Sequence, residues 1–224
     1  MVKDLLIFDM DGVLVEVSES YRETIQQTVQ HFTGKRIERE TIQEWKNQGG
    51  WNDDWALSHA LIQAAGVKVE FQDVVDRFQK LFHGDGTDGL MLRERWIAEP
   101  GLFDRLTGFA TCAVFTGRLR WEANLTLQRF SPETFKPVVG VDDVSRPKPD
   151  PEGILKIRDM VPHRRVWYIG DTVDDARSAK AAGVPFIGVA APSGLRRDEL
   201  IGLFHSEGAQ AVIGDINELE RVTA

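Results

Sequence analysis

The order of apolar and polar residues divides the chain into two kinds of sequence. One kind repeats short apolar runs, each followed by a segment with apolar residues at helical spacing. Such runs are typical of strands buried in a parallel sheet, and their alternation with helices implies βαβ units. We therefore predict a doubly wound, Rossmann-like α/β fold with strands near residues 5–8, 111–115, 137–141, 166–169, 186–189 and 211–213.

A second kind of sequence interrupts this alternation after the first run. Between residues 18 and 96 the apolar residues recur every three or four positions, and no segment has a convincing strand pattern. Ser20 with Glu23, and Thr41 with Glu44, have the spacing of helix capping boxes. We predict a four-helix insert, an α-helical cap domain over residues 18–96, inside a core domain made of residues 1–17 and 97–224.

Composition narrows the classes of protein and partner. The chain has 224 residues, 42% of them hydrophobic, and a formal net charge of −8 without a Lys/Arg block, which argues against nucleic acid or an anionic membrane as the main partner. Cys112 is the only cysteine, so an internal disulfide is impossible and a reducing compartment is expected. No signal-peptide pattern and no apolar run near the ~20 residues of a membrane helix is present. We expect a soluble cytoplasmic protein and no membrane partner.

Two acids follow the first apolar run directly. Asp9 and Asp11 are separated by one residue, so they face the same side as the chain leaves the sheet. Two carboxylates at the end of a buried strand are costly unless a cation compensates them, and ligands bind at the carboxyl ends of strands in open α/β sheets. One acid could serve as a nucleophile and the other as an acid/base. The alternative is a solvated turn with two ordinary acids.

Polar residues follow later runs in the same way. Thr116 and Gly117 follow the second run, Lys148 lies in a proline-rich turn, and Asp171, Asp174 and Asp175 follow the run at 166–169. If these side chains converge, oxygen-only ligands would select a hard ion such as Mg²⁺, and the lysine and hydroxyl would hold a phosphate. Singly, Thr116 could be a helix N-cap and Lys148 a solvated surface residue.

The same segments resemble a known family. FDMDGV, FTGR, KPDP and GDTVDD are similar, in this order, to the four motifs of the haloacid dehalogenase (HAD) superfamily. The insert directly after the first motif resembles the helical-cap subclass, the phosphoglycolate phosphatase-like subfamily IA.

The resemblance implies a role for each matching residue. Asp9 would be the nucleophile, and Asp11 would protonate the leaving group and then activate water. Thr116 and Lys148 would bind the phosphoryl oxygens and complete the catalytic set. Substrate binding would also involve Gly117 and Arg118, although Arg118 could instead lie on a helix surface. The implied Mg²⁺ ligands are Asp9, Asp11 through its backbone carbonyl, Asp171 and Asp175.

These expectations together describe an enzyme, a phosphoric monoester hydrolase. We predict a Mg²⁺-dependent phosphatase that hydrolyses a small phosphorylated metabolite through a phosphoaspartyl intermediate on Asp9. A phosphomutase of the same superfamily, a dehalogenase and, from another class, a receiver-like phospho-signalling module are the alternatives. Asp11 argues against the dehalogenase, since that chemistry needs no acid for an alkoxide. The sequence leaves the substrate and the oligomeric state unknown.

Overall fold

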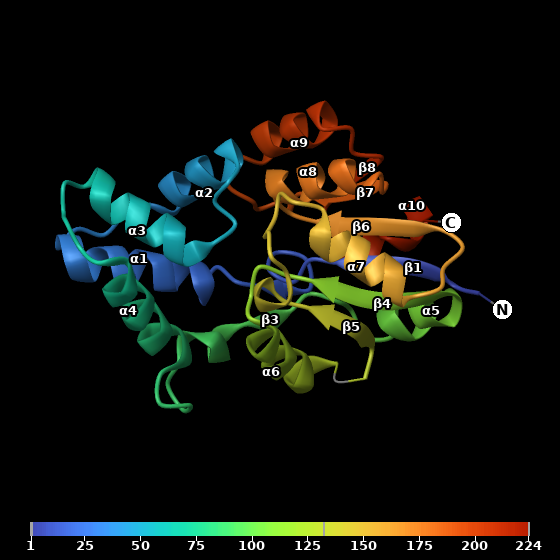
Figure 1. The fold of residues 1–224 in the computed structure, drawn as a ribbon, viewed down its shortest axis with the longest axis horizontal. Helices are drawn as coiled ribbons and strands as arrows, with labels where there is room; N and C mark the ends of the chain where they lie inside the picture. The colour runs from blue at the N-terminus through green and yellow to red at the C-terminus, as the bar shows by residue number, and fades with distance from the viewer. Residues whose placement is uncertain (1, 132, 224) are drawn as a thin grey trace. The chain divides into compact units, whose positions relative to one another are not determined.

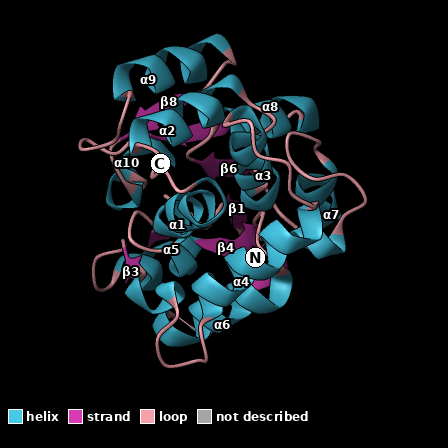
Figure 2. Ribbon diagram, turned by 90° about the vertical axis from the view of Figure 1, so that its left-hand side faces the viewer, coloured by secondary structure: helices cyan, strands magenta, loops and turns pink. Residues whose placement is uncertain are grey.

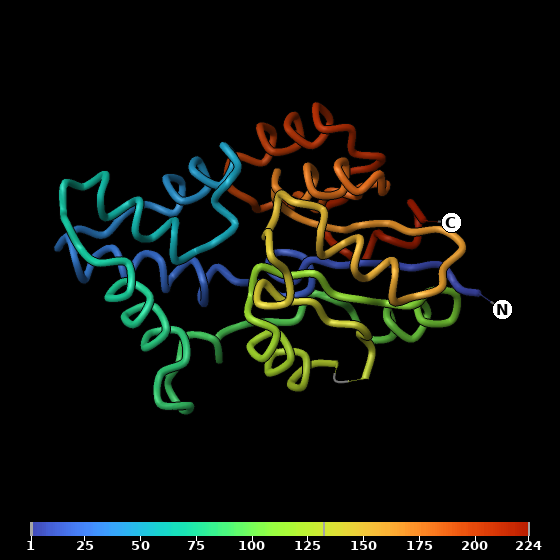
Figure 3. The backbone as a smooth tube through the Cα atoms, in the orientation of Figure 1, coloured from blue at the N-terminus to red at the C-terminus, as the bar shows by residue number. Residues whose placement is uncertain are grey.

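The computed structural model describes residues 2–131 and 133–223. These residues form two compact units, which we call the sheet unit (residues 1–15 and 96–224) and the helical unit (Glu16–Arg95). Figure 3 shows the chain leaving the sheet unit in blue and returning to it in green. The helical unit starts two residues before the predicted insert and ends one residue before it.

The sheet unit contains six parallel strands, which confirms the predicted doubly wound α/β fold. Their order is β5-β4-β1-β6-β7-β8, so the chain builds outward from β1 on one side and then on the other (Figure 1). Strand order therefore reverses at β1, where open α/β sheets place their ligand site. The strands are β1 (Asp4–Phe8), β4 (Ala110–Phe115), β5 (Phe135–Val139), β6 (Val166–Gly170), β7 (Phe186–Val189) and β8 (Ala211–Ile213).

Helices cover both faces of this sheet because successive residues of β1 point to opposite faces. Leu5 and Ile7 are fully buried in a core that also contains apolar residues of α7, α8 and α9, whereas the ring of Phe8 lies 5.8 Å from that of Phe103 on α5. Figure 2 shows β6, β1 and β4 side by side. The helices are α5 (Leu102–Phe109), α6 (Arg120–Phe130), α7 (Glu152–Met160), α8 (Val173–Ala182), α9 (Arg197–Ser206) and α10 (Glu220–Thr223), with the short 3₁₀ turns η2 (Val141–Asp143) and η3 (Ile216–Glu218).

Several elements differ from the prediction. The strand predicted at 137–141 is β5, which lies two residues earlier, because Val141 donates its N–H to Arg118 O and begins a 3₁₀ turn. Helix α5 was not predicted at all. Two short strands, β2 (Val15–Glu16) and β3 (Arg95–Trp96), pair with each other where the chain passes between the units, so the expectation of no strand within 18–96 is wrong at its end.

The helical unit contains the four predicted helices, α1 (Tyr21–Thr33), α2 (Arg39–Gln48), α3 (Asp54–Ala64) and α4 (Phe71–His83), followed by the 3₁₀ turn η1 (Leu90–Arg93). Their apolar sides form its core, in which the rings of Tyr21 and Phe82 lie 4.1 Å apart. Both predicted capping boxes are wrong: Ser20 precedes α1 but makes no side-chain cap bond, and Thr41 lies inside α2. Instead, Asp53 caps α3 by accepting two backbone N–H bonds.

None of the helices among the described residues is long and apolar enough to cross a lipid bilayer.

Candidate active site

Three polar residues lie at one edge of the sheet because they follow neighbouring parallel strands. Asp9 follows β1, Thr116 follows β4, and Asp171 follows β6. The register aligns the end of β1 with the ends of both neighbours, and the N–H of Asp9 donates to Ile169 O of β6 at 2.7 Å. The sheet itself therefore brings Asp9 together with Thr116 and Asp171, which lie 107 and 162 positions further along the chain.

A cluster of three carboxylates surrounds one ammonium group at this edge. Asp9, Asp171 and Asp175 each place an oxygen within 4.8 Å of the others. Lys148 Nζ lies 2.8 Å from Asp9 Oδ1 and 2.8 Å from Asp175 Oδ1, and its side chain is 1% exposed. Lys148 is thus not a solvated surface residue. When all groups are ionised, three negative charges and one positive charge leave two negative charges uncompensated.

Aromatic rings enclose the ammonium group of Lys148. Its Nζ lies 5.0 Å from the centre of the Phe115 ring and 5.5 Å from that of Tyr168, distances at which a ring face attracts a cation. Burial acts to lower the pKa of Lys148, but the charges of Asp175 and Asp9 outweigh it and the pKa is raised. Lys148 therefore remains a cation at every physiological pH.

The environment of Asp9 disfavours its ionised form. Burial raises its pKa to about 7, with the charges of Asp175 and Asp11 acting in the same direction and Lys148 acting against them. A carboxylate taken out of water needs further positive charge to remain ionised. A cation beside Asp9 would supply that charge.

The carboxylate of Asp175 is held by three side chains. Its Oδ1 accepts the hydroxyl of Tyr168 at 2.7 Å and lies 2.8 Å from the ammonium of Lys148, and its Oδ2 accepts the N–H and the hydroxyl of Thr172. Burial acts to raise the pKa of Asp175, but Lys148, Thr172 and Tyr168 lower it overall. Sequence reasoning missed Tyr168 and Thr172. A hydroxyl within an apolar strand and a T-x-x-D capping box at the start of α8 were the available signals.

Gly12 allows the carboxylate of Asp171 to approach the loop after β1. Gly12 has a φ of +72°, and a Cβ built on it would lie 1.9 Å from Asp171 Oδ2. The two segments thus approach so closely that the loop accepts no side chain there. The absence of Cβ makes room for the acid at the cluster.

The residues of the cluster suit a hard divalent cation. All of their donor atoms are oxygens, the uncompensated charge is two, and Gly12 leaves room for the carboxylate of Asp171. Carboxylate oxygens are the ligands that Mg²⁺, Ca²⁺ and Mn²⁺ share. Asp9 and Asp171 are the strongest candidates, because Asp175 already accepts bonds on both oxygens.

Asp11 forms a second centre beside this cluster. Its carboxylate pairs with Arg118, which is buried and not on a helix surface as one alternative had it. Thr116 is fully buried, and its hydroxyl accepts the N–H of Arg118 at 3.2 Å. Helix α6 begins after Leu119, so Thr116 is not its N-cap. Gly117 lies between them in the same turn.

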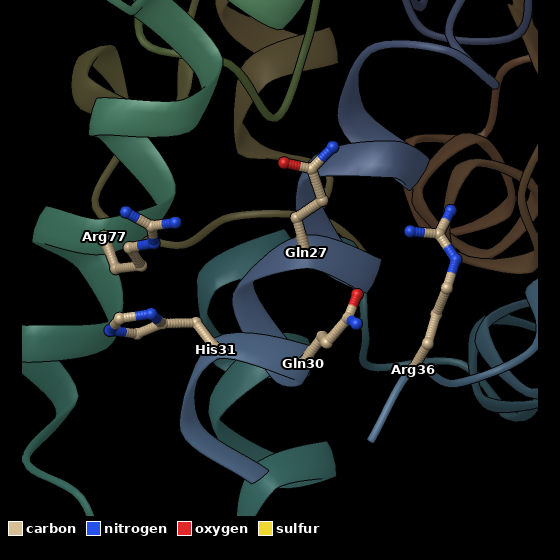
Figure 4. A pocket seen from close by; sticks show the side chains of 5 residues that line it. All are labelled: Gln27, Gln30, His31, Arg36 and Arg77. Carbon is tan, nitrogen blue, oxygen red and sulfur yellow. The ribbon is translucent and has the colours of Figure 1, made fainter. Parts of the chain in front are cut away.

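The helical unit carries a polar pocket of its own, of about 330 Å³. Figure 4 shows Gln27, Gln30 and His31 of α1 opposite Arg77 of α4, with Arg36 to one side. Arg36 donates two hydrogen bonds to the carboxylate of Glu23. None of the predicted site residues lines this pocket.

Comparison with known proteins agrees with this geometry. The family model of haloacid dehalogenase-like hydrolases matches residues 6–189. A protein of Phytophthora nicotianae named imidazoleglycerol-phosphate dehydratase is 34% identical over 98% of the chain, but the chain spans only 48% of that relative. A phosphoglycolate phosphatase of Rhodobacter capsulatus is 25% identical over 90% of each chain.

Solved structures share the fold. A haloacid dehalogenase-like hydrolase from Bacteroides fragilis superposes with a TM-score of 0.77 at 21% identity, covering 97% of this chain and 99% of the other. The family match and the phosphatase-named relatives support an enzyme with phosphatase activity. This chain therefore belongs to the haloacid dehalogenase-like hydrolase family, as its four motifs predicted.

Proposed function

We propose that this protein is a Mg²⁺-dependent phosphatase that hydrolyses a small phosphorylated metabolite through a phosphoaspartyl intermediate on Asp9. The observation that carries the proposal is the buried carboxylate of Asp9, held at one oxygen by Lys148 within a cluster of acids. Lys148 orients Asp9 Oδ1 and leaves Oδ2 for attack on phosphorus. Haloacid dehalogenase-like phosphatases and the all-oxygen donor set both favour a divalent metal.

The chemistry divides into two displacements at phosphorus. First, Asp9 forms a bond to phosphorus while the bond to the leaving oxygen breaks, and Asp11 gives that oxygen a proton. Next, water attacks phosphorus, Asp11 takes the proton of the water, and the bond to Asp9 breaks to release phosphate. Lys148 and the hydroxyl of Thr116 bind phosphoryl oxygens through both steps.

The metal would be held by Asp9, Asp171 and the backbone carbonyl of Asp11. When bound, Mg²⁺ would offset the charge of the phosphoryl oxygens and allow an anionic nucleophile to approach them. Asp175 acts mainly by holding Lys148, because both of its oxygens already accept hydrogen bonds. The metal ligands predicted from sequence included Asp175, and the ligand set proposed here leaves it out.

We assign the helical unit, Glu16–Arg95, to the role of a cap that carries substrate selectivity. It is a compact unit inserted directly after the first motif. Replacing residues 16–95 by a short linker should leave a folded sheet unit with lower rate and lower selectivity between esters. An unchanged rate and preference in the capless protein would contradict this role.

The experiment that tests the proposed function is phosphate release from a panel of esters. The panel includes phosphoglycolate and imidazoleglycerol phosphate, taken from the names of the relatives, and p-nitrophenyl phosphate. We expect turnover with Mg²⁺, loss of turnover with excess chelator, and a burst of alcohol release that Asp9→Asn abolishes. Full activity in chelator, or in Asp9→Asn, would contradict the proposal. The phosphomutase alternative predicts an isomer product once a bisphosphate activator is added.

A further inference from the structure

Arg118 is a buried cation that the reaction scheme above does not use. Its side chain is 1% exposed, although a guanidinium is costly to remove from water unless it is paired. Nε donates to Asp11 Oδ1 at 2.9 Å, and Nη2 donates to the same oxygen. Nη1 donates to the hydroxyl of Thr126 on α6 at 2.9 Å. Arg118 thus connects helix α6 to the loop that follows β1.

The contact is asymmetric with respect to the two oxygens of Asp11. Both donors from Arg118 reach Oδ1, and Oδ2 accepts no hydrogen bond from any residue in the described part of the chain. The side chain of Asp11 is 30% exposed. One oxygen is therefore fixed, and the other is open to a substrate or to water.

We infer that Arg118 is a positioning residue for Asp11, which it holds by Oδ1 so that Oδ2 faces the leaving group and later the attacking water. This inference rests on the proposed function, because it assigns a role within that reaction. It replaces the sequence expectation that Arg118 binds substrate. Anchoring by Thr126 matters because Asp11 lies in a loop, and a misplacement of about 1 Å in a catalytic group can cost roughly 10²-fold in rate.

The test compares leaving groups under single-turnover conditions. A poor alkoxide needs the proton of Asp11, whereas p-nitrophenolate scarcely does, so Arg118→Ala should slow phosphoglycolate about 10²-fold or more and p-nitrophenyl phosphate at most ~10-fold. Arg118→Lys should recover part of the loss, since one ammonium can reach Oδ1 but cannot also hold Thr126.

A double variant separates positioning from damage to the fold. In an Asp11→Asn background, Arg118→Ala should cause no further loss on phosphoglycolate, because the carboxylate it positions is already gone. Thr126→Val keeps the Arg118–Asp11 pair and should show the same preference for p-nitrophenyl phosphate with a smaller loss, so it serves where Arg118→Ala does not fold.

Arg165 provides a control ion pair away from the site. Together with Arg164 it pairs with the buried Asp4 at the opposite end of β1, at 2.8 Å, so Arg165→Ala weakens an Asp–Arg contact far from the site. It should lower thermal stability and leave the ratio of the two ester rates unchanged.

Two outcomes would overturn the inference: equal losses on both esters in Arg118→Ala and Thr126→Val, or a loss that adds to that of Asp11→Asn. Either outcome can occur while the wild type is active and Asp9→Asn is inactive. Failure of the Arg118 inference is therefore distinct from failure of the proposed function.

Discussion

Gly12→Ala should damage the proposed metal site without replacing any of its ligands. Gly12 lies between Asp11 and Val13 in the loop after β1, and its N–H donates to Val15 O at 2.8 Å. An added Cβ would lie 1.9 Å from Oδ2 and 2.6 Å from Cγ of Asp171. Because Cβ atoms essentially never approach another atom within 3.0 Å, the carboxylate has to move.

The required movement is large on the scale of metal coordination. Restoring 3.0 Å from 1.9 Å takes a shift of 1.1 Å, whereas metal–oxygen distances tolerate only about ±0.2 Å. We therefore expect a loss of Mg²⁺ affinity of about 10–100-fold, the range found when a group that orients a ligand is removed. Alanine at a φ of +72° also costs about 1–2 kcal/mol in folding stability.

Gly34→Ala separates these two effects. Gly34 follows α1, has the same φ of +72°, and a Cβ built there meets no atom within 4 Å. Both variants should lose similar stability in chelator, measured by denaturant unfolding. Only Gly12→Ala should need more Mg²⁺ for half-maximal phosphate release and show less stabilisation by Mg²⁺, about 1.4 kcal/mol less for each tenfold loss of affinity at saturating metal.

The reasoning is refuted if Gly12→Ala reaches half-maximal activity at the wild-type Mg²⁺ concentration. That result would mean that Asp171 either moves without cost or holds no metal. A loss of activity that no concentration of Mg²⁺ reverses, with unchanged stabilisation by the metal, would also contradict it.

Two further substitutions test the electrostatics of the cluster. The pKa of Asp9 is raised to about 7 in the fold against 3.8 for the ordinary side chain, so its neutral form favours folding below pH ~4 and this contribution is lost by pH ~7. In chelator, Asp9→Asn should thus match the wild type near pH 4 and exceed its stability at pH 8 by up to about 4 kcal/mol; a less stable variant at pH 8 would be the contrary result. Tyr168→Phe removes one donor to Asp175 and should cost about 1–1.5 kcal/mol in urea unfolding, while Lys148 remains paired and phosphate release stays within a few-fold; loss of all turnover would show that Tyr168 does more.

The fold was largely predictable from sequence because burial produces recognisable apolar patterns within short segments. Strands buried on both faces must be apolar throughout, so β1, β6 and β7 appear as continuous apolar runs. The two-residue strands β2 and β3 could not be predicted in this way. They are too short for a pattern, and they pair across 79 residues. Ser20 and Glu23 match a capping motif, but Ser20 lacks the extended backbone that a cap needs.

The acids of the site were predictable for the same reason, but the partner of Asp11 was not. Asp9 and Asp171 are conspicuous because each follows an apolar run at the carboxyl end of a strand. The pairing of Arg118 with Asp11 joins residues 107 apart, and no local pattern specifies it. Sequence reasoning could state that a buried charge needs a partner, but it could not pair Arg118 with Asp11.

Under the proposed function, the pairing of each acid with its cation gives two similar acids different roles. Asp9 and Asp11 are two residues apart and intrinsically alike, yet each is paired with a different buried cation from a different loop. Lys148 is shared between Asp9 and Asp175, so Asp9 is compensated only in part and remains in need of a metal. Arg118 reaches one oxygen of Asp11 with two donors, so Asp11 has a cationic partner that Asp9 does not share. In the proposed reaction, nucleophile and proton carrier would therefore be distinguished by their partners and not by their own side chains.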